Sequence, residues 1–175
     1  YIEQQKIISA VILQEKSGKV RLLNEFNREV SLSGNRLSHI SQTKLDTGLS
    51  RESLVSQLKE LTENRKNLSG AINIRELWEI LHEEQVDIDL STMTMFCFDP
   101  PLTSDHEAAV IRAFFQDRLY FKFNKTLFAP YSPEQVELKK RQIIEAEKRE
   151  RQIQLGAKWI NDIMSRESGS RSEER

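Results

Sequence analysis

Hydrophobic and polar positions along the chain follow two different periods, and the change between them falls near residue 50. Before it, apolar and β-branched residues occur in three short runs at 6–14, 20–23 and 29–32. Residues typical of tight turns, such as Ser17-Gly18 and Asn27, separate these runs. This pattern predicts a β-meander, which is stable only if it closes into a small barrel or packs against the helices that follow.

From residue 50 the apolar positions recur about every 3.6 residues, which predicts a helical region. A first helix is expected to end near Asn67, and a short one is expected over 90–98, where Pro100 and Pro101 stop it. Asn73 with Glu76 has the spacing of a capping box, in which two residues satisfy each other's free backbone amides.

Ser104 with Glu107 has the same spacing and predicts the start of a further helix. Residues 119–123 and 126–129 then read as a strand, a two-residue turn and a second strand. Three helices followed by a β-hairpin is the element order of a winged helix-turn-helix. We therefore expect one over residues 50–131.

The last predicted helix is unusually polar. Ser132, Pro133 and Gln135 mark its start, and residues 137–154 are mostly Lys, Arg, Glu and Gln. A polar helix of this kind usually bridges domains. The tail at 165–175 is polar and is expected to be disordered.

The expected fold class is thus α+β: a small antiparallel β-module, a winged helix-turn-helix and a long charged C-terminal helix. We place the β-module and its connector at 1–49, the winged-helix domain at 50–131, the linker helix at 132–164 and the tail at 165–175.

Composition narrows the function without naming it. The 175 residues include 26 Lys and Arg against 27 Asp and Glu, a net charge of −1, which excludes a uniformly basic nucleic-acid binder. No apolar run approaches the roughly 18 residues of a membrane span, so no membrane partner is expected. A single cysteine fits a reducing compartment, and we expect a cytoplasmic protein. The first residue is Tyr1 rather than Met, which suggests a piece of a longer chain.

No catalytic constellation stands out in the sequence. Asp87, Asp89, Asp99 and Asp105 fall at expected helix starts and turns, where aspartate caps backbone amides. The three histidines are isolated, without the spacing of a zinc site. Cys97 lies between two phenylalanines, so we expect a buried thiol rather than a nucleophile.

Basic residues are the remaining candidates for chemistry. One group accompanies the predicted strands and consists of Lys16, Lys19, Arg21, Arg28 and Arg36. These cations form either an ordinary solvated strand face or a surface that contacts phosphates. A second group accompanies the last helix of the winged-helix region and its hairpin: Arg112, Arg118, Tyr120, Lys122 and Lys125. There a base could stack on Tyr120 while the cations hold phosphates. The neighbouring phenylalanines recur at the spacing of buried residues, so we expect most of them to pack inside the fold.

Three segments carry a resemblance to a known family. Residues 74–81 (IRELWEIL) together with 103–123 (TSDHEAAVIRAFFQDRLYFKF) resemble the winged-helix region of bacterial RNB-family, ribonuclease II-like exoribonucleases. Residues 18–37 are similar to the small β-module that precedes it in that family, and the charged helix from Ser132 also follows the pattern. The resemblance covers about residues 6–160, and none of its motifs is catalytic.

The resemblance implies that this chain is the amino-terminal part of a longer hydrolase. Enzymes of that family degrade RNA from its 3′ end, with magnesium bound by aspartates of an RNB domain that this chain does not contain. The chain would then be an accessory module that binds single-stranded RNA or organises domains, with the downstream catalytic domain as its partner. Which residues contact RNA does not follow from the resemblance.

Two other classes remain open. The first is a winged-helix regulator that binds DNA, although its recognition helix would begin with two carboxylates, Asp105 and Glu107, which face phosphates poorly. The second is a protein-interaction or spacer module, because residues 50–131 carry 13 acidic residues against 9 basic ones.

Overall fold

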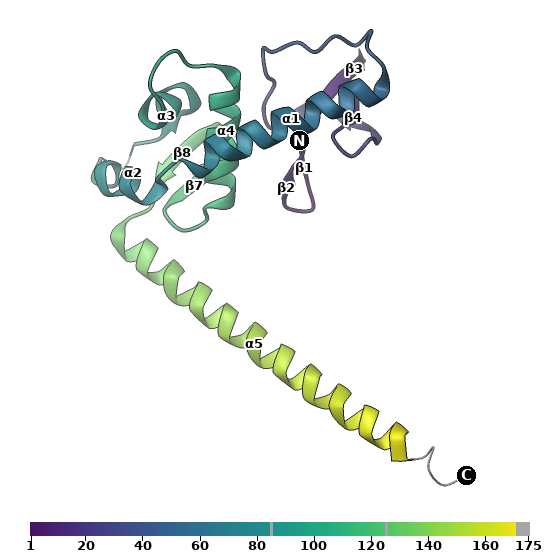
Figure 1. The fold of residues 1–175 in the computed structure, drawn as a ribbon. Helices are drawn as coiled ribbons and strands as arrows, with labels where there is room; N and C mark the ends of the chain where they lie inside the picture. The colour runs from purple at the N-terminus through teal and green to yellow at the C-terminus, as the bar shows by residue number, and fades with distance from the viewer. Residues whose placement is uncertain (85, 125, 171–175) are drawn as a thin grey trace. The chain divides into compact units, whose positions relative to one another are not determined.

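The computed structural model describes residues 1–84, 86–124 and 126–170, with side chains as far as Ile163 (Figure 1). Its contacts divide the chain into two compact units, residues 1–131 and residues 132–175. The first unit contains every sheet of the described chain, and the second is a single long helix.

The predicted β-meander is confirmed. Strands β3 (Ala10–Lys16), β4 (Lys19–Asn24) and β5 (Glu29–Ser33) form an antiparallel sheet in that order. Ser17 and Gly18 connect β3 to β4 with positive φ angles of 51° and 75°, which is the geometry of a type I′ hairpin turn. The sheet is followed by a short 3-10 turn, η1 (Gly34–Arg36).

A second, smaller hairpin precedes the meander and was not predicted. Strands β1 (Ile2–Glu3) and β2 (Lys6–Ile7) pair with each other across Gln4 and Gln5. Both of these glutamines have a positive φ, 48° and 61°. The sequence offers no glycine or asparagine there, so the usual signal for such a turn is missing.

The meander is stabilised by packing against a helix. Helix α1 (Arg51–Gly70) begins at Ser50, whose side chain accepts a hydrogen bond from the Ser53 amide. Leu54 and Val55 of α1 form a buried cluster with Leu23 of β4. Val20 and Leu22 of β4 form a second buried cluster, together with Ile8 and Leu32.

The rest of the first unit has three more helices and a second three-stranded sheet. The elements are α2 (Ile74–Leu81), β6 (Ile88–Asp89), α3 (Leu90–Cys97), α4 (Ser104–Gln116), β7 (Phe121–Asn124) and β8 (Leu127–Pro130). The sheet order is β6-β8-β7, all antiparallel. Three phenylalanines pack edge to face in its core, with Phe114 of α4 contacting Phe121 and Phe128 at ring distances of 5.0 and 4.8 Å.

The helix starts test two of the predicted caps. Asn73 does cap α2, because its side chain accepts the Glu76 amide at 3.2 Å. The predicted cap of α4 is wrong by one residue. Thr103, not Ser104, is the N-cap, and it forms a capping box with His106 instead of Glu107.

The second unit is helix α5 (Pro133–Ser170). Its start lies where it was predicted. Ser132 and Gln135 cap each other there, since Ser132 accepts the Gln135 amide at 3.3 Å and Gln135 accepts the Ser132 amide at 3.0 Å. The helix extends six residues past the predicted boundary at 164, into the segment expected to be disordered. The last five residues of that segment, 171–175, lie outside the described part.

The observed architecture is therefore mixed α+β, with small antiparallel sheets, five α-helices within the described residues and a long C-terminal helix. None of those helices is both long enough and apolar enough to span a lipid bilayer.

Candidate functional site

The tip of the β3–β4 hairpin gathers three of the candidate cations. Lys16 and Lys19 are direct partners across the two strands. The Gly34 amide donates to the Gly18 carbonyl at 3.0 Å, which brings η1 and its Arg36 to the same turn. All three side chains are exposed, and no acidic partner is found for them within the described residues. We call Lys16, Lys19 and Arg36 the basic tip.

The basic tip has an electrostatic cost. Like charges directly opposite each other on neighbouring strands destabilise a hairpin, and here two ammonium groups are opposed at its last pair. An anion bound between them would remove that repulsion. This is the arrangement expected of a surface that contacts phosphates.

Two further candidates near the meander are already paired. Arg21 lies on the same face of β4 as Lys19, with its Nε 3.9 Å from Glu29. Arg28 Nη2 donates to Glu3 at 3.1 Å. Both pairs are exposed, so they hold the side chains only weakly. Arg21 can extend the basic tip along β4. Arg28 lies in the turn between β4 and β5, at the other end of β4 from the basic tip.

The members of the second predicted group differ in how far they are exposed. Arg118 is exposed and donates to Gln5 at 3.4 Å, and Lys122 is exposed on β7. Tyr120 is half-buried, and its ring lies 5.3 Å from that of Trp78. A ring packed in this way has only part of its face available to a base. Lys125 lies outside the described residues.

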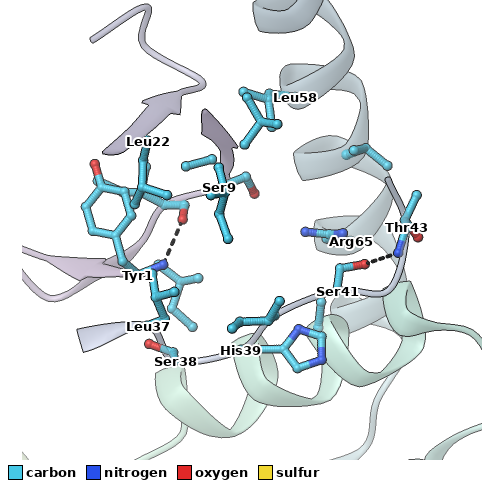
Figure 2. A pocket seen from close by; sticks show the side chains of 18 of the residues that line it. Tyr1, Ser9, Leu22, Leu37, Ser38, His39, Ser41, Thr43, Leu58 and Arg65 are labelled. Carbon is cyan, nitrogen blue, oxygen red and sulfur yellow. Dashed lines mark hydrogen bonds between the residues drawn. The ribbon is translucent and has the colours of Figure 1, made fainter. Parts of the chain in front are cut away.

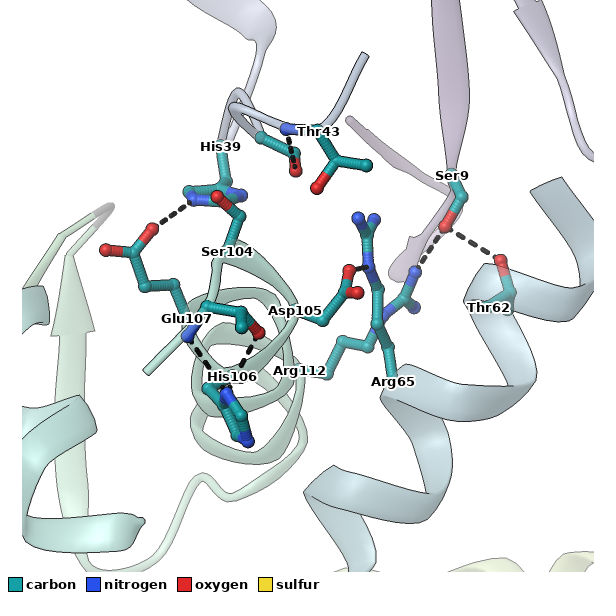
Figure 3. A network of polar contacts seen from close by, with 12 residues as sticks. Ser9, His39, Thr43, Thr62, Arg65, Ser104, Asp105, His106, Glu107 and Arg112 are labelled. Atoms are coloured by element: carbon teal, nitrogen blue, oxygen red, sulfur yellow. Dashed lines mark hydrogen bonds and ion pairs between the residues drawn. The ribbon is translucent and has the colours of Figure 1, made fainter. Parts of the chain in front are cut away.

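Arg112 belongs to the interior, which corrects its assignment as a nucleic-acid contact. Its side chain is only 7% exposed. Nη2 donates to Ser9 Oγ at 2.6 Å and Nη1 to the Ile7 carbonyl at 3.2 Å. Ser9 Oγ also accepts the Thr62 hydroxyl at 2.7 Å (Figure 3). Arg112 thus connects α4 to the segment that enters β3, and it cannot reach a phosphate at the surface.

The burial of Arg112 is only partly compensated. Desolvation lowers the pKa of its guanidinium from the ordinary value, while the nearby Glu25 carboxylate opposes that shift and Arg65 adds to it. Its Nε atom has no hydrogen-bond partner within the described chain. A sequence signal did exist, because Arg112 follows Ala108 by four residues and therefore lies on the apolar face of α4.

A second polar set ties the connector after η1 to α4. His39 Nε2 lies 3.0 Å from Glu107 Oε2, and the Gln42 amide donates to Ser104 Oγ at 3.2 Å. Arg65 of α1 pairs with Asp105 at 2.7 Å, and both side chains are mostly buried. Figure 3 shows the His39–Glu107 and Arg65–Asp105 pairs on the first turn of α4. The two predicted carboxylates of that turn therefore serve as partners of a histidine and an arginine.

Between the meander, the connector, α1 and α4 lies a cavity of about 330 Å³ (Figure 2). Its walls are aliphatic for the most part, and its polar residues include Ser9, Ser41, Thr43 and Arg65. Arg112, Lys44 and His39 also contribute to its lining. Sequence reasoning missed this cavity, because its parts come from four segments whose packing the hydrophobic pattern does not specify.

The metal-ligating and nucleophilic side chains of the described residues lie as follows in the fold. No group of three or more His, Cys, Asp or Glu in the described part of the chain could hold a metal ion. Burial raises the pKa of the Cys97 thiol to about 12, so it is a poor nucleophile at neutral pH. Asp89 caps α3 as predicted, and hydrogen bonds from Thr92 lower its pKa.

Comparison of the chain with protein-family models, with curated proteins and with solved structures finds no match.

Proposed function

We propose that this chain is the amino-terminal accessory part of an RNB-family exoribonuclease and that it contacts single-stranded RNA through the basic tip. Hydrolysis of RNA from its 3′ end, with magnesium, would take place in a catalytic domain outside these 175 residues. In this proposal the chain guides RNA and organises domains, and it carries no catalytic residue of its own.

The element order supports the assignment. After α1, the chain runs α2, β6, α3, α4 and then the β7–β8 hairpin. A helical region that ends in a hairpin, with a small antiparallel sheet beside it, is consistent with the winged helix that the resemblance implies. The meander before it is consistent with the small β-module of the same family, and the polar helix α5 is suited to lead toward another domain.

The observation that carries the RNA contact is the opposed pair Lys16 and Lys19. Their repulsion serves no purpose in the fold, since the turn between them is already specified by Ser17 and Gly18. Arg36 adds a third cation and Arg21 a fourth along the strand. A surface of this kind holds the sugar-phosphate backbone without reading sequence.

The direct test is binding of a labelled single-stranded RNA, followed by fluorescence anisotropy over a series of salt concentrations. For three contacts, log K should fall with log salt with a slope of about −2. The double substitution Lys16→Glu with Lys19→Glu should weaken binding about tenfold or more at low salt and make the slope shallower by about 1.4.

A matched control is the double substitution Lys59→Glu with Lys66→Glu on α1, which changes net charge by the same amount at exposed positions. It should bind RNA nearly as the parent does. Equal loss in both variants would mean that only overall charge matters and would contradict a contact at the tip. Tighter binding of duplex DNA than of single-stranded RNA of equal length would contradict the proposed RNA role.

A further inference from the structure

The cavity between the meander and helices α1 and α4 has the properties of a small-molecule site. Its volume of about 330 Å³ lies at the lower end of the range of about 300–1,000 Å³ for ligand pockets. The exposed side chains Ile12, Ile40 and Lys44 are among its lining residues, so it reaches the protein surface at β3 and the connector.

The walls specify the body of the ligand. Aliphatic side chains from all four surrounding segments line the cavity, among them Ile8, Leu37, Leu45, Leu58 and Ile111. Tyr1 and His39 supply the only rings of the lining within the described residues. Aliphatic walls suit an alkyl chain better than a flat base, which would need aromatic faces for stacking.

The charges specify the other end of the ligand. Arg65, Arg112 and Lys44 line the cavity, whereas none of the described lining residues is acidic. Asp105 and Glu25, which face the two arginines, do not line it. The charged groups exposed to the cavity are therefore hydrogen-bond donors, and an anion there can accept from them while the two carboxylates stay behind its walls.

Arg65 supplies the donors. Its Nε is used by Asp105, but no acceptor within the described chain takes a hydrogen bond from its two terminal amino groups. The side chain is nevertheless only 12% exposed. Figure 2 shows its guanidinium beside Ser9, Ser41 and Thr43 at the polar side of the cavity. A carboxylate can accept two parallel hydrogen bonds from such a fork.

We propose that this cavity binds a small aliphatic carboxylate, with its carboxylate on Arg65 and its alkyl chain between the meander and helices α1 and α4. The size of the cavity sets the length of that chain. A cavity of about 150 Å³ accommodates benzene, so one about twice as large holds about ten to thirteen non-hydrogen atoms. Octanoate has ten.

The experiment is a calorimetric titration of the 175-residue chain with octanoate, octanol, inorganic phosphate and adenosine 5′-monophosphate. Octanoate should bind about tenfold or more tightly than octanol, because a charged hydrogen bond separates the two ligands. Octanoate should also raise the midpoint of thermal unfolding, since it binds the folded state only. Phosphate, which lacks the chain, should bind far more weakly.

Two variants locate the site. Arg65→Gln should abolish the preference for octanoate over octanol while leaving octanol binding unchanged. Arg65→Gln also removes the partner of Asp105, so a second variant changes the volume of the cavity instead. Ala108→Met, on the α4 wall, should fill the cavity and abolish binding of both ligands. Circular dichroism and thermal unfolding establish that each variant folds.

Several outcomes would overturn the proposal. These are an absence of octanoate binding, equal affinity for octanoate and octanol, and octanoate binding that Ala108→Met leaves intact. Tighter binding of adenosine 5′-monophosphate than of octanoate would also overturn it and would assign the cavity to a nucleotide. The RNA titration of the basic tip is independent of all of these, so either proposal can fail alone.

Discussion

Ser9 holds together two elements that are far apart in the sequence. It is 5% exposed, and its hydroxyl oxygen receives hydrogen bonds from Arg112 of α4 and Thr62 of α1. Its backbone amide donates to Glu25 at 3.0 Å. One small side chain is thus the acceptor for a buried cation and a buried hydroxyl at once.

Ser9→Ala should lower the free energy of unfolding by about 3 kcal/mol, because it leaves a buried guanidinium donor and a hydroxyl without an acceptor. Urea unfolding followed by circular dichroism measures the change. Ser31→Ala on the exposed face of β5 is the control and should lie within about 0.5 kcal/mol of the parent. Similar stabilities for the two variants would contradict the role of Ser9.

The raised pKa of the Cys97 thiol predicts how fast this thiol reacts at a given pH. Burial raises the pKa of its thiol to about 12, whereas an unfolded thiol ionises near pH 8.5–9. At pH 8 the folded protein should therefore react with a disulfide reagent such as DTNB about a thousandfold more slowly than the protein in urea. Equal rates in the two states would show that the thiol is accessible and ionised.

The same shift affects stability at alkaline pH. Below pH 8 the thiol is protonated in both states, so it adds no pH dependence. As pH rises toward 12, the unfolded state loses its proton first, and the folded state becomes less stable relative to it. Cys97→Ala should therefore lose less stability than the parent between pH 8 and 11. A parallel decline of the two proteins would contradict the raised pKa.

For single residues, the sequence predicted the role of a side chain where its hydrogen-bond partners are close in the chain. It did not predict the role where those partners are far away in the chain. Asn73 and Asp89 cap helices as expected, because a cap needs only the next three residues. Arg112 was grouped with the candidate nucleic-acid contacts because it accompanies the basic and aromatic residues of the last helix and its hairpin. Its actual acceptors, at Ile7 and Ser9, are more than 100 positions away.

At the scale of the elements, the turn of the β3–β4 hairpin contains a glycine at a positive φ angle. Gly18 has φ +75°, a conformation that residues with a Cβ adopt only with strain. Gly70, at the end of α1, has ordinary helical geometry and open space where a Cβ would be. The two glycines therefore predict opposite responses to the same substitution.

Gly18→Ala should destabilise the protein by about 1 kcal/mol, and Gly70→Ala should stabilise it by about 0.5–1 kcal/mol. Thermal unfolding of both variants measures the two signs. If Gly18→Ala were neutral, the turn at the basic tip would not need its left-handed geometry.

The elements that the sequence missed are those with the least pattern. Strand β6 has only two residues and lies between two helices, which is too short for an alternating pattern. The β1–β2 turn has two glutamines at positive φ, where glycine or asparagine is the usual signal. The cap of α4 was displaced by one residue because Thr103 and Ser104 are equivalent as sequence signals. Only the partner at the third helical position, His106 or Glu107, distinguishes them.

At the scale of the whole chain, the two units differ in how their helices are stabilised. In α4, residues 108–114 are all buried, so the helix gains most of its stability from packing. In α5 every residue from Arg141 to Ile160 is exposed. Helices without tertiary contacts are marginal in water, and here local ion pairs such as Arg141 with Glu137 at 3.6 Å add only tenths of a kcal/mol.

Hydrogen exchange should separate the two helices. Amides of residues 109–114 should exchange only through global unfolding, whereas amides of 141–160 should exchange at least about a hundredfold faster through local opening. Mass spectrometry of peptides from the 175-residue chain, with the unfolded chain as the reference, measures both. Equal protection of α4 and α5 at high dilution would contradict this account. It would mean that the charged helix is stable without a partner, and α5 would then have no energetic need of another domain beside it.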